Sequence, residues 1–233
     1  MNGHISDDGD TEAMFSRIAR HYDLFNRLAS LNLAYYWRRK TAATACPDKI
    51  SDALDICCGT GDMAFALAKT GNVEKITGLD ASRAMLACAE KKQGKIKTPF
   101  DWLCAPATQT NLDCEAFDLI TCAFGLRNIP DKTAALKEMH RLLKKGGRVC
   151  ILEFSIPDSF LLRRICLLYL RFAVPLIGRL LLGSGGPADY LARSIRDWDR
   201  TIVPKEMLTA AGFKEVRTLP LTGGIVSVHI GAK

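Results

Sequence analysis

Short apolar runs that alternate with helical patterns constrain the fold of this chain more than any other feature. Apolar residues recur at helical spacing within 63–69, 84–92 and 134–143. The apolar runs around these segments are ALDIC (53–57), KITGL (75–79), FDWLC (100–104), FDLITCAF (117–124) and GRVCILEF (147–154). Strands that alternate with helices are typical of a parallel sheet. We therefore predict an α/β fold, a Rossmann-like and mostly parallel sheet with helices on both faces.

The end of the chain departs from this rhythm. A helix over 205–211 should stop at Gly212 and precede two strand-like runs, 213–221 and 225–233, which a short turn with two glycines joins. Runs joined in this way form hairpins, so one C-terminal strand should run antiparallel. Earlier, Gly146 and Gly147 should stop the third helical segment and lead into the fifth strand.

The N-terminal region predicts helices. Residues 1–10 are polar and acidic, which indicates a disordered tail. Apolar residues then recur at helical spacing at Met14, Ile18, Tyr22, Phe25 and Leu28. A second helix should run over 37–45 until Pro47 ends it. We expect residues 11–233 to form a single domain with a helical cap over 11–46.

Residues 159–200 look like a helical insertion. The run 160–183 is strongly apolar, but four arginines interrupt it: Arg163, Arg164, Arg171 and Arg179. A membrane-spanning helix needs about 20 mostly apolar residues with few charges, so this run does not predict a span. Two interpretations stay open: a cover helix packed on the sheet, or a lid or interfacial helix that serves an apolar substrate.

Charge and cysteine usage narrow the partners. The net charge is +7, but the basic residues form no dense stripe, so we expect no nucleic-acid binding. The nine cysteines include no Cys-x-x-Cys pair and no accompanying histidine cluster, so we expect no metal site. An odd number of cysteines and an acidic, polar start predict buried thiols in a cytoplasmic protein.

The segment LDICCGTGD (54–62) has the composition of a cofactor loop. A strand that contains Asp55 leads through Gly59, Thr60 and Gly61 into a helix, which lets a ligand approach the backbone N–H groups. An acid that binds ribose hydroxyls should end the next strand about 20 residues later. Asp80 follows KITGL at that distance. A bare glycine turn would not explain this acid, so we favour a cofactor site.

Two cofactors fit the loop. The glycines followed by Ala64 satisfy the looser dinucleotide fingerprint. However, Asp55 would repel a pyrophosphate, and the expected C-terminal hairpin is not part of the dinucleotide-binding pattern. S-adenosylmethionine carries a sulfonium and an ammonium group, which suit an acid, so we expect it as the cofactor.

Further motifs flank this loop. FSRIARHYDLFNRLAS (15–30) and YYWR (35–38) precede it; FGLRNIPD (124–131), LEFS (152–155), YLARSI (190–195) and LTGGIVSVHIGAK (221–233) follow it. With them, nearly the whole chain resembles the class I S-adenosylmethionine-dependent methyltransferases. Among these it is most similar to the menaquinone/ubiquinone biosynthesis C-methyltransferases, closest to the menaquinone-type members. The FGLRNIPD segment is the most specific match.

The resemblance implies a set of cofactor-binding residues: Asp55, Gly59, Thr60, Gly61, Asp80, Ala81, Met85, Pro106, Ala107 and Ala123. Three positions depart from the family pattern. Pro106 stands where members have an acid or amide near the adenine, which leaves Ala107 as a backbone contact. Ala123 replaces a serine before the FGLRN loop, and Ala34 replaces a histidine before Trp37.

The resemblance also implies a reaction. A methyl group would pass to a ring carbon of a reduced, prenylated quinone, with demethylmenaquinol to menaquinol, in menaquinone biosynthesis, as the leading expectation. A quinol oxygen that loses its proton pushes electron density onto the neighbouring carbon, which then displaces the sulfonium in line. The protein supplies alignment and a dry pocket.

Arg127, Asn128 and Tyr22 are the candidate catalytic residues, and Asp23 of the N-terminal helix is a further candidate near the chemistry. Arginine stays protonated, so Arg127 should stabilise a developing phenolate and not act as a base. Asn128 would orient the ring oxygen and Tyr22 would close the pocket. Alternatively, Arg127 braces its loop and Tyr22 is a core residue. His229 is a weaker candidate, and His140 should be structural.

Other functions stay open beside this one. The acceptor could be a benzoquinol precursor of ubiquinone or another small aromatic or lipid molecule. From a different class, the chain could be a noncatalytic S-adenosylmethionine-binding protein; Pro106 favours this alternative, whereas Arg127 and Asn128 argue against it. An apolar substrate suggests peripheral contact of 159–183 with the inner face of the membrane. The sequence indicates no oligomeric state.

Overall fold

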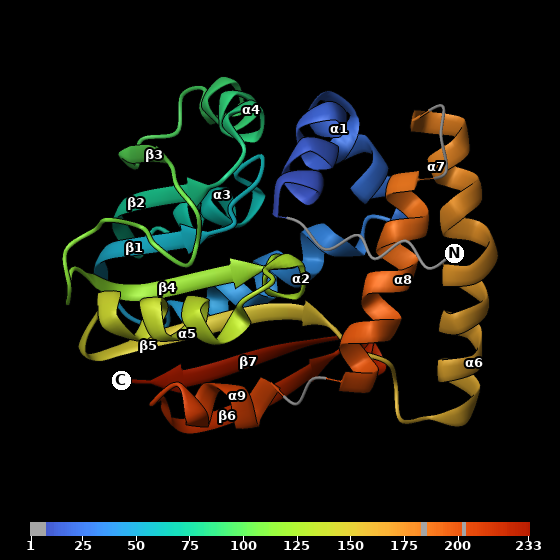
Figure 1. The fold of residues 1–233 in the computed structure, drawn as a ribbon. Helices are drawn as coiled ribbons and strands as arrows, with labels where there is room; N and C mark the ends of the chain where they lie inside the picture. Colours follow the sequence, from blue (N-terminus) through green and yellow to red (C-terminus); the bar gives the residue numbers. More distant parts are fainter. Residues whose placement is uncertain (1–7, 183–185, 202–203) are drawn as a thin grey trace.

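Seven strands form one sheet in the order β3-β2-β1-β4-β5-β7-β6 in the computed structural model, which describes residues 8–182, 186–201 and 204–233 (Figure 1). The strands are β1 (Ile50–Ile56), β2 (Val73–Asp80), β3 (Phe100–Cys104), β4 (Phe117–Ala123), β5 (Leu143–Phe154), β6 (Lys214–Leu221) and β7 (Val226–Ala232). The pairs from β3 to β5 are parallel, and β7 runs antiparallel to both β5 and β6. The predicted sheet with one antiparallel C-terminal strand is confirmed.

Helices cover both faces of this sheet, as predicted (Figure 1). They are α1 (Asp8–Ala29), α2 (Leu33–Ala45), α3 (Asp62–Ala68), α4 (Arg83–Gln93), α5 (Lys132–Leu142), α6 (Phe160–Leu168), α7 (Val174–Leu182), α8 (Gly186–Thr201) and α9 (Pro204–Ala210). Apolar residues of α2 and α3 pack on one face of the sheet, and those of α5 and α9 pack on the other.

The central strands are apolar on both sides because helices cover both faces. Ala53 and Leu54 are neighbours in β1, and both are fully buried. Successive side chains of a strand point to opposite faces, so Ala53 joins the core beneath α2 and Leu54 joins the core beneath α5. The apolar runs of the sequence therefore mark strands buried on both faces.

Two predicted boundaries differ in the structure. Helix α1 begins at Asp8, so the last three residues of the predicted disordered tail are helical, and residues 1–7 lie outside the described part. Strand β5 begins at Leu143 and includes Gly146, which therefore does not stop helix α5. At this point the register between β4 and β5 shifts, and Gly146, with φ of +78°, fits the irregular stretch.

The segment between β5 and α9 lies beyond the carboxyl ends of the parallel strands (Figure 1). A π-helical turn at Tyr169–Ala173 joins α6 to α7. Helix α7 packs on α1 and α8 around the buried side chains of Phe25, Val174 and Ala188. Within the described residues, every helix is too short or too polar to cross a membrane.

Candidate active site

A cavity of about 210 Å³ opens at the carboxyl ends of β1, β2 and β4. Strand β2 pairs with one edge of β1 and β4 pairs with the other, so the strand order reverses direction at β1. Open α/β sheets bind ligands at such a reversal of strand order. Most predicted site residues line this cavity: Tyr22, Gly59, Asp80, Ala81, Met85, Pro106, Ala107, Ala123 and Asn128. The fold thus brings together predicted site residues from five separate segments of the chain.

The carboxylate of Asp80 is held in place by two backbone N–H groups. Its Oδ2 accepts a hydrogen bond from the N–H of Gly59 and its Oδ1 from the N–H of Ser82, each at 2.8 Å. Burial raises the pKa of Asp80 above its usual value, although these two hydrogen bonds oppose the rise. Each oxygen keeps a second lone pair, so a pair of ribose hydroxyls can bind here.

The loop after β1 needs its glycines for backbone conformation. Gly59 and Gly61 have φ of +56° and +83°, in the left-handed region that favours glycine. A Cβ atom at Gly61 would also lie 2.9 Å from the ring of Phe65. Gly61 lines none of the cavities described here, so its part is to shape the turn.

Asp55 lies beneath this loop and is fully buried. Its Oδ1 accepts a hydrogen bond from the hydroxyl of Thr121 at 2.7 Å, and its Oδ2 accepts one from the N–H of Ala64 at 3.1 Å. Burial raises the pKa of Asp55 to about 7, against the lowering effect of Thr121, Arg38 and Ala64. Asp55 lines a cavity of about 20 Å³ together with Thr60. That it faces the cation of the donor stays a prediction.

A third cavity, of about 40 Å³, lies between α1, α2, the end of β4 and α8. Phe124 and Phe154 form an aromatic wall with ring centroids 4.7 Å apart. Leu191 and Arg127 are also part of its lining. Tyr22 lines this cavity as well as the two described above, so its side chain stands where all three meet.

The guanidinium of Arg127 braces the loop after β4. Its Nη1 donates to Oε1 of Glu153 at 2.9 Å and also to the carbonyl of Phe124, while its backbone N–H donates to Oε2 of Glu153. Both side chains are buried, at 5% and 0% exposure. These contacts match the alternative interpretation of Arg127 as a brace, and they leave its Nε–H without an acceptor among the described residues.

Asn128 is oriented by helix α8. Its Oδ1 accepts a hydrogen bond from the hydroxyl of Tyr190 at 3.0 Å, and its Nδ2 donates to the carbonyl of Phe124. The amide is therefore fixed at the edge of the cavity of about 210 Å³, where one of its N–H groups can still meet a ligand.

The histidines considered as bases lie away from these cavities. Nδ1 of His229 lies 2.9 Å from the hydroxyl of Thr218 on the neighbouring strand, and burial lowers the pKa of His229 to about 4. The ring of His140 packs edge-on against Phe213. In the described residues, no three His, Cys, Asp or Glu side chains are grouped so as to hold a metal ion.

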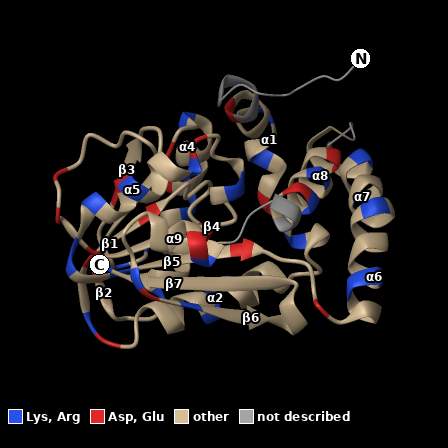
Figure 2. Ribbon diagram, turned by 60° about the horizontal axis from the view of Figure 1, so that its bottom comes forward, with Lys and Arg blue, Asp and Glu red and all other residues tan. Residues whose placement is uncertain are grey.

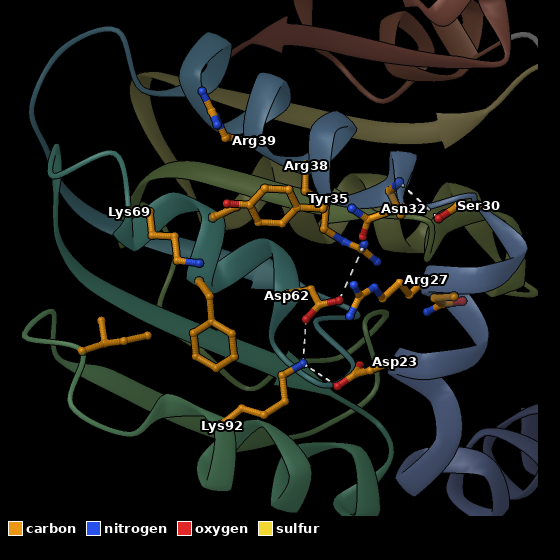
Figure 3. A pocket seen from close by; sticks show the side chains of 15 residues that line it. Asp23, Arg27, Ser30, Asn32, Tyr35, Arg38, Arg39, Asp62, Lys69 and Lys92 are labelled. Carbon is orange, nitrogen blue, oxygen red and sulfur yellow. Dashed lines mark hydrogen bonds and ion pairs between the residues drawn. The ribbon is translucent and has the colours of Figure 1, made fainter.

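A fourth pocket, of about 440 Å³, lies among α1, α2, α3 and α4 and is called the outer pocket here (Figure 3). Five cationic side chains line it: Arg27, Arg38, Arg39, Lys69 and Lys92. Nζ of Lys92 lies 2.8 Å from Asp23 and 2.6 Å from Asp62. Asp23 in turn accepts a hydrogen bond from the hydroxyl of Thr60. This network ties α1 and α4 to the glycine loop after β1.

The sequence prediction missed several residues of the site, although their segments were recognised. Arg38, Glu153 and Tyr190 belong to the YYWR, LEFS and YLARSI motifs. Phe15 and Ser82 also line the cavity of about 210 Å³. The hydroxyl of Ser82 lies 2.8 Å from that of Ser16, and the ring of Phe15 packs edge-on against Tyr190 of α8, so both contacts hold α1 in place. A motif match locates such residues, but only the fold shows what each one contacts.

A model of the ubiE/COQ5 methyltransferase family matches residues 4–233. Similar curated proteins are named demethylmenaquinone methyltransferase. The protein from Bacillus licheniformis is 37% identical, with 94% of this chain and 95% of that protein covered. The protein from Geobacillus kaustophilus is 36% identical over 99% of both, and one from Staphylococcus epidermidis is 35% identical over 94% of this chain and 91% of that protein.

Solved structures share the fold at lower sequence identity. An S-adenosylmethionine-dependent methyltransferase from Thermotoga maritima has a TM-score of 0.64 and 20% identity, with 96% of this chain and 99% of that chain covered. A protein of the same description from Methanococcus maripaludis also has a TM-score of 0.64, at 18% identity, over 94% and 93% of the two chains. These likenesses bear on the fold alone.

Proposed function

Because the chain belongs to the ubiE/COQ5 methyltransferase family, we propose that it methylates a ring carbon of demethylmenaquinol, with S-adenosylmethionine as the methyl donor. The observation that carries this proposal is the pair of adjoining cavities that share Tyr22 and Phe124. One cavity has the acid and the glycine loop that a nucleoside needs, and the other has aromatic walls. A methyl group at their junction can pass from one ligand to the other.

In this proposal the donor occupies the cavity of about 210 Å³. Its ribose hydroxyls bind Asp80, and its adenine lies against Met85 and Ala107, which are buried apolar side chains. Pro106 offers no side-chain hydrogen bond, so the adenine is held there by packing and by the backbone of Ala107. Its sulfonium end points past Gly59 toward Tyr22.

The quinol ring binds at the cavity of about 40 Å³ between Phe124 and Leu191, which has to widen to take a bicyclic ring. Proton loss from a ring oxygen creates a phenolate, whose electron density moves to the neighbouring carbon. That carbon attacks the methyl group, the carbon–sulfur bond breaks, and the electron pair stays on sulfur. The methylated carbon then loses its hydrogen as a proton to water, and the ring oxygen takes up a proton, which restores the aromatic quinol. The Nε of Arg127 can donate to the phenolate, while Asn128 orients the oxygen. Alignment and exclusion of water supply most of the rate acceleration.

Incubation with labelled S-adenosylmethionine and demethylmenaquinol tests the proposal. We expect labelled menaquinol, and less product from the benzoquinol precursor of ubiquinone. The oxidised quinone is the control: it cannot form a phenolate, so it should accept no methyl group. Preference for the benzoquinol would correct the acceptor, and no transfer to either quinol would refute quinol methylation.

We also propose that α6 and α7 contact the inner face of the membrane. Large apolar side chains of these helices and of the π-helical turn between them are exposed: Phe160, Leu161, Ile165, Leu168, Phe172, Leu176 and Leu180. The four arginines of the same segment are exposed too, and 160–182 contains no acid (Figure 2). An apolar stripe flanked by arginines suits an anionic lipid surface. Such contact would bring the prenylated substrate beside α1 and α8, whose side chains line the cavity of about 40 Å³.

Sedimentation with vesicles that contain phosphatidylglycerol tests this contact. We expect binding that weakens with salt and is lost in the double variant Leu168→Glu, Phe172→Glu. Leu219→Glu is the matched control, because Leu219 is an exposed leucine on β6. Equal binding of the double variant and the control would refute the proposed surface.

A further inference from the structure

Arg38 of α2 lies where three of the four cavities meet. It lines the cavity beneath the donor loop, the aromatic cavity and the outer pocket. The residue is only 8% exposed, which is unusual for an arginine. Figure 3 shows its side chain reaching toward Asp62, whereas the side chain of Arg39 lies apart from that acid.

The guanidinium of Arg38 is poorly paired for a buried cation. Its Nη1 lies 3.6 Å from Oδ2 of Asp62, too far for a hydrogen bond. Its Cζ lies 5.3 Å from the centre of the Phe124 ring. Its Nε has no hydrogen-bond partner among the described residues. A buried charged group without such partners is costly. The position therefore indicates a ligand that brings an acceptor.

The amino-acid end of the donor can reach this guanidinium. The cavity of about 210 Å³ and the cavity of about 20 Å³ beneath the glycine loop adjoin, because both are lined by Tyr22, Cys57, Gly59 and Ala123. With the ribose at Asp80, the rest of the donor extends past Gly59 into the space that Arg38 lines. The α-carboxylate is the one anionic group of S-adenosylmethionine, and arginine binds carboxylates through charge-assisted hydrogen bonds.

We infer that Arg38 binds the α-carboxylate of S-adenosylmethionine and thereby sets the depth at which the methyl group stands. Asp55 lines the same small cavity, and so does Asp62. Two acids would repel a third carboxylate, so binding of this group needs a cation between them. Arg38 supplies that cation, while Asp55 attracts the ammonium group of the same ligand. The inference concerns the donor and holds for any methyl acceptor.

Decarboxylated S-adenosylmethionine is the sharpest probe, because it keeps the adenosine, the sulfonium and the amine but lacks the carboxylate. Calorimetry without acceptor compares the dissociation constants (Kd) of the two ligands. We expect the wild-type protein to bind S-adenosylmethionine at least about 10-fold more tightly, the effect of one hydrogen-bonded charge pair. In Arg38→Met this preference should vanish, through weaker binding of the carboxylated ligand only. Arg38→Lys should keep part of it.

Arg39→Met is the matched control, since it removes the same charge from the next residue and should keep the preference. A wild-type protein that binds both ligands equally would overturn the inference without any variant. Equal weakening of both ligands in Arg38→Met would overturn it too, and would make Arg38 a structural support of the loop. A changed KM for the quinol with unchanged donor Kd would instead place Arg38 on the acceptor side.

Discussion

The hydroxyl of Tyr190 donates a hydrogen bond to Oδ1 of Asn128 at 3.0 Å and so joins α8 to the loop after β4. The two residues are 62 positions apart in the chain. The bond fixes which side of the Asn128 amide faces the donor cavity, because the oxygen is turned toward Tyr190 and the nitrogen donates to the carbonyl of Phe124.

Removal of this hydroxyl should slow the reaction without weakening donor binding. A neutral hydrogen bond contributes about 0.5–1.5 kcal/mol, so Tyr190→Phe should lower kcat roughly 3- to 10-fold. Steady-state kinetics and calorimetry check the two quantities separately. Tyr169→Phe is the control, because the Tyr169 hydroxyl bonds to the carbonyl of Ala29 and not to the FGLRN loop. An equal loss of kcat in both variants would contradict a specific part for Tyr190.

Asp80→Ala should weaken S-adenosylmethionine binding at least about 100-fold. The change removes the acceptor for two ribose hydroxyls, each bonded to a charged group at roughly 1.5–3 kcal/mol. It also frees the N–H groups of Gly59 and Ser82, which the carboxylate holds. Asp80→Asn keeps one acceptor and should bind with intermediate affinity in calorimetry. Unchanged affinity in Asp80→Ala would refute the ribose assignment.

Donor affinity should depend on pH through Asp55. Burial raises the pKa of Asp55 to about 7, so below that pH the empty protein holds a proton there. A cationic ligand favours the ionised acid, so binding must expel that proton. Affinity should therefore fall as pH drops from 8 to 5, by up to about 10-fold per unit. Calorimetry in two buffers measures the released proton, and Asp55→Asn should release none. A flat wild-type profile would contradict this account.

The same group should make the empty protein less stable as pH rises. A folded-state pKa above the unfolded value of 3.8 means that the folded protein binds more protons between about pH 4 and 7. The free energy of unfolding should fall through this window, by at most about 1.4 kcal/mol per pH unit from this acid. Asp55→Asn should have a shallower slope in urea unfolding, because the amide does not titrate.

Removal of one partner from the buried ion pair of Arg127 and Glu153 should strongly lower the free energy of unfolding. Arg127→Met leaves the Glu153 carboxylate buried without its cation and should lower the free energy of unfolding by about 3–5 kcal/mol. The double variant Arg127→Met, Glu153→Met should recover much of that stability in urea unfolding. Its methyl transfer should stay lost if Arg127 also stabilises the phenolate. Full activity in the double variant would leave Arg127 as a brace alone.

The sheet could be predicted because its residues follow local rules. Strands buried on both faces are continuous apolar runs, and the acid at the end of β2 stands at a fixed distance from the glycine loop. Contacts between distant segments could not be predicted in this way. Nothing local indicates that Arg38 is buried beside Phe124, or that Glu153 faces Arg127. Gly146 was misjudged because the irregular pairing of β4 and β5 depends on the neighbouring strand.

The buried acid beneath the donor loop links the amount of folded protein to cell metabolism. Without a cationic ligand, Asp55 stays in a place where its ionisation is unfavourable. S-adenosylmethionine binds only the folded chain, and a ligand with this property raises the folded fraction by mass action. When the supply of methyl donor falls, more of the chain unfolds and is exposed to proteolysis. The abundance of the protein should therefore follow the availability of its own methyl donor.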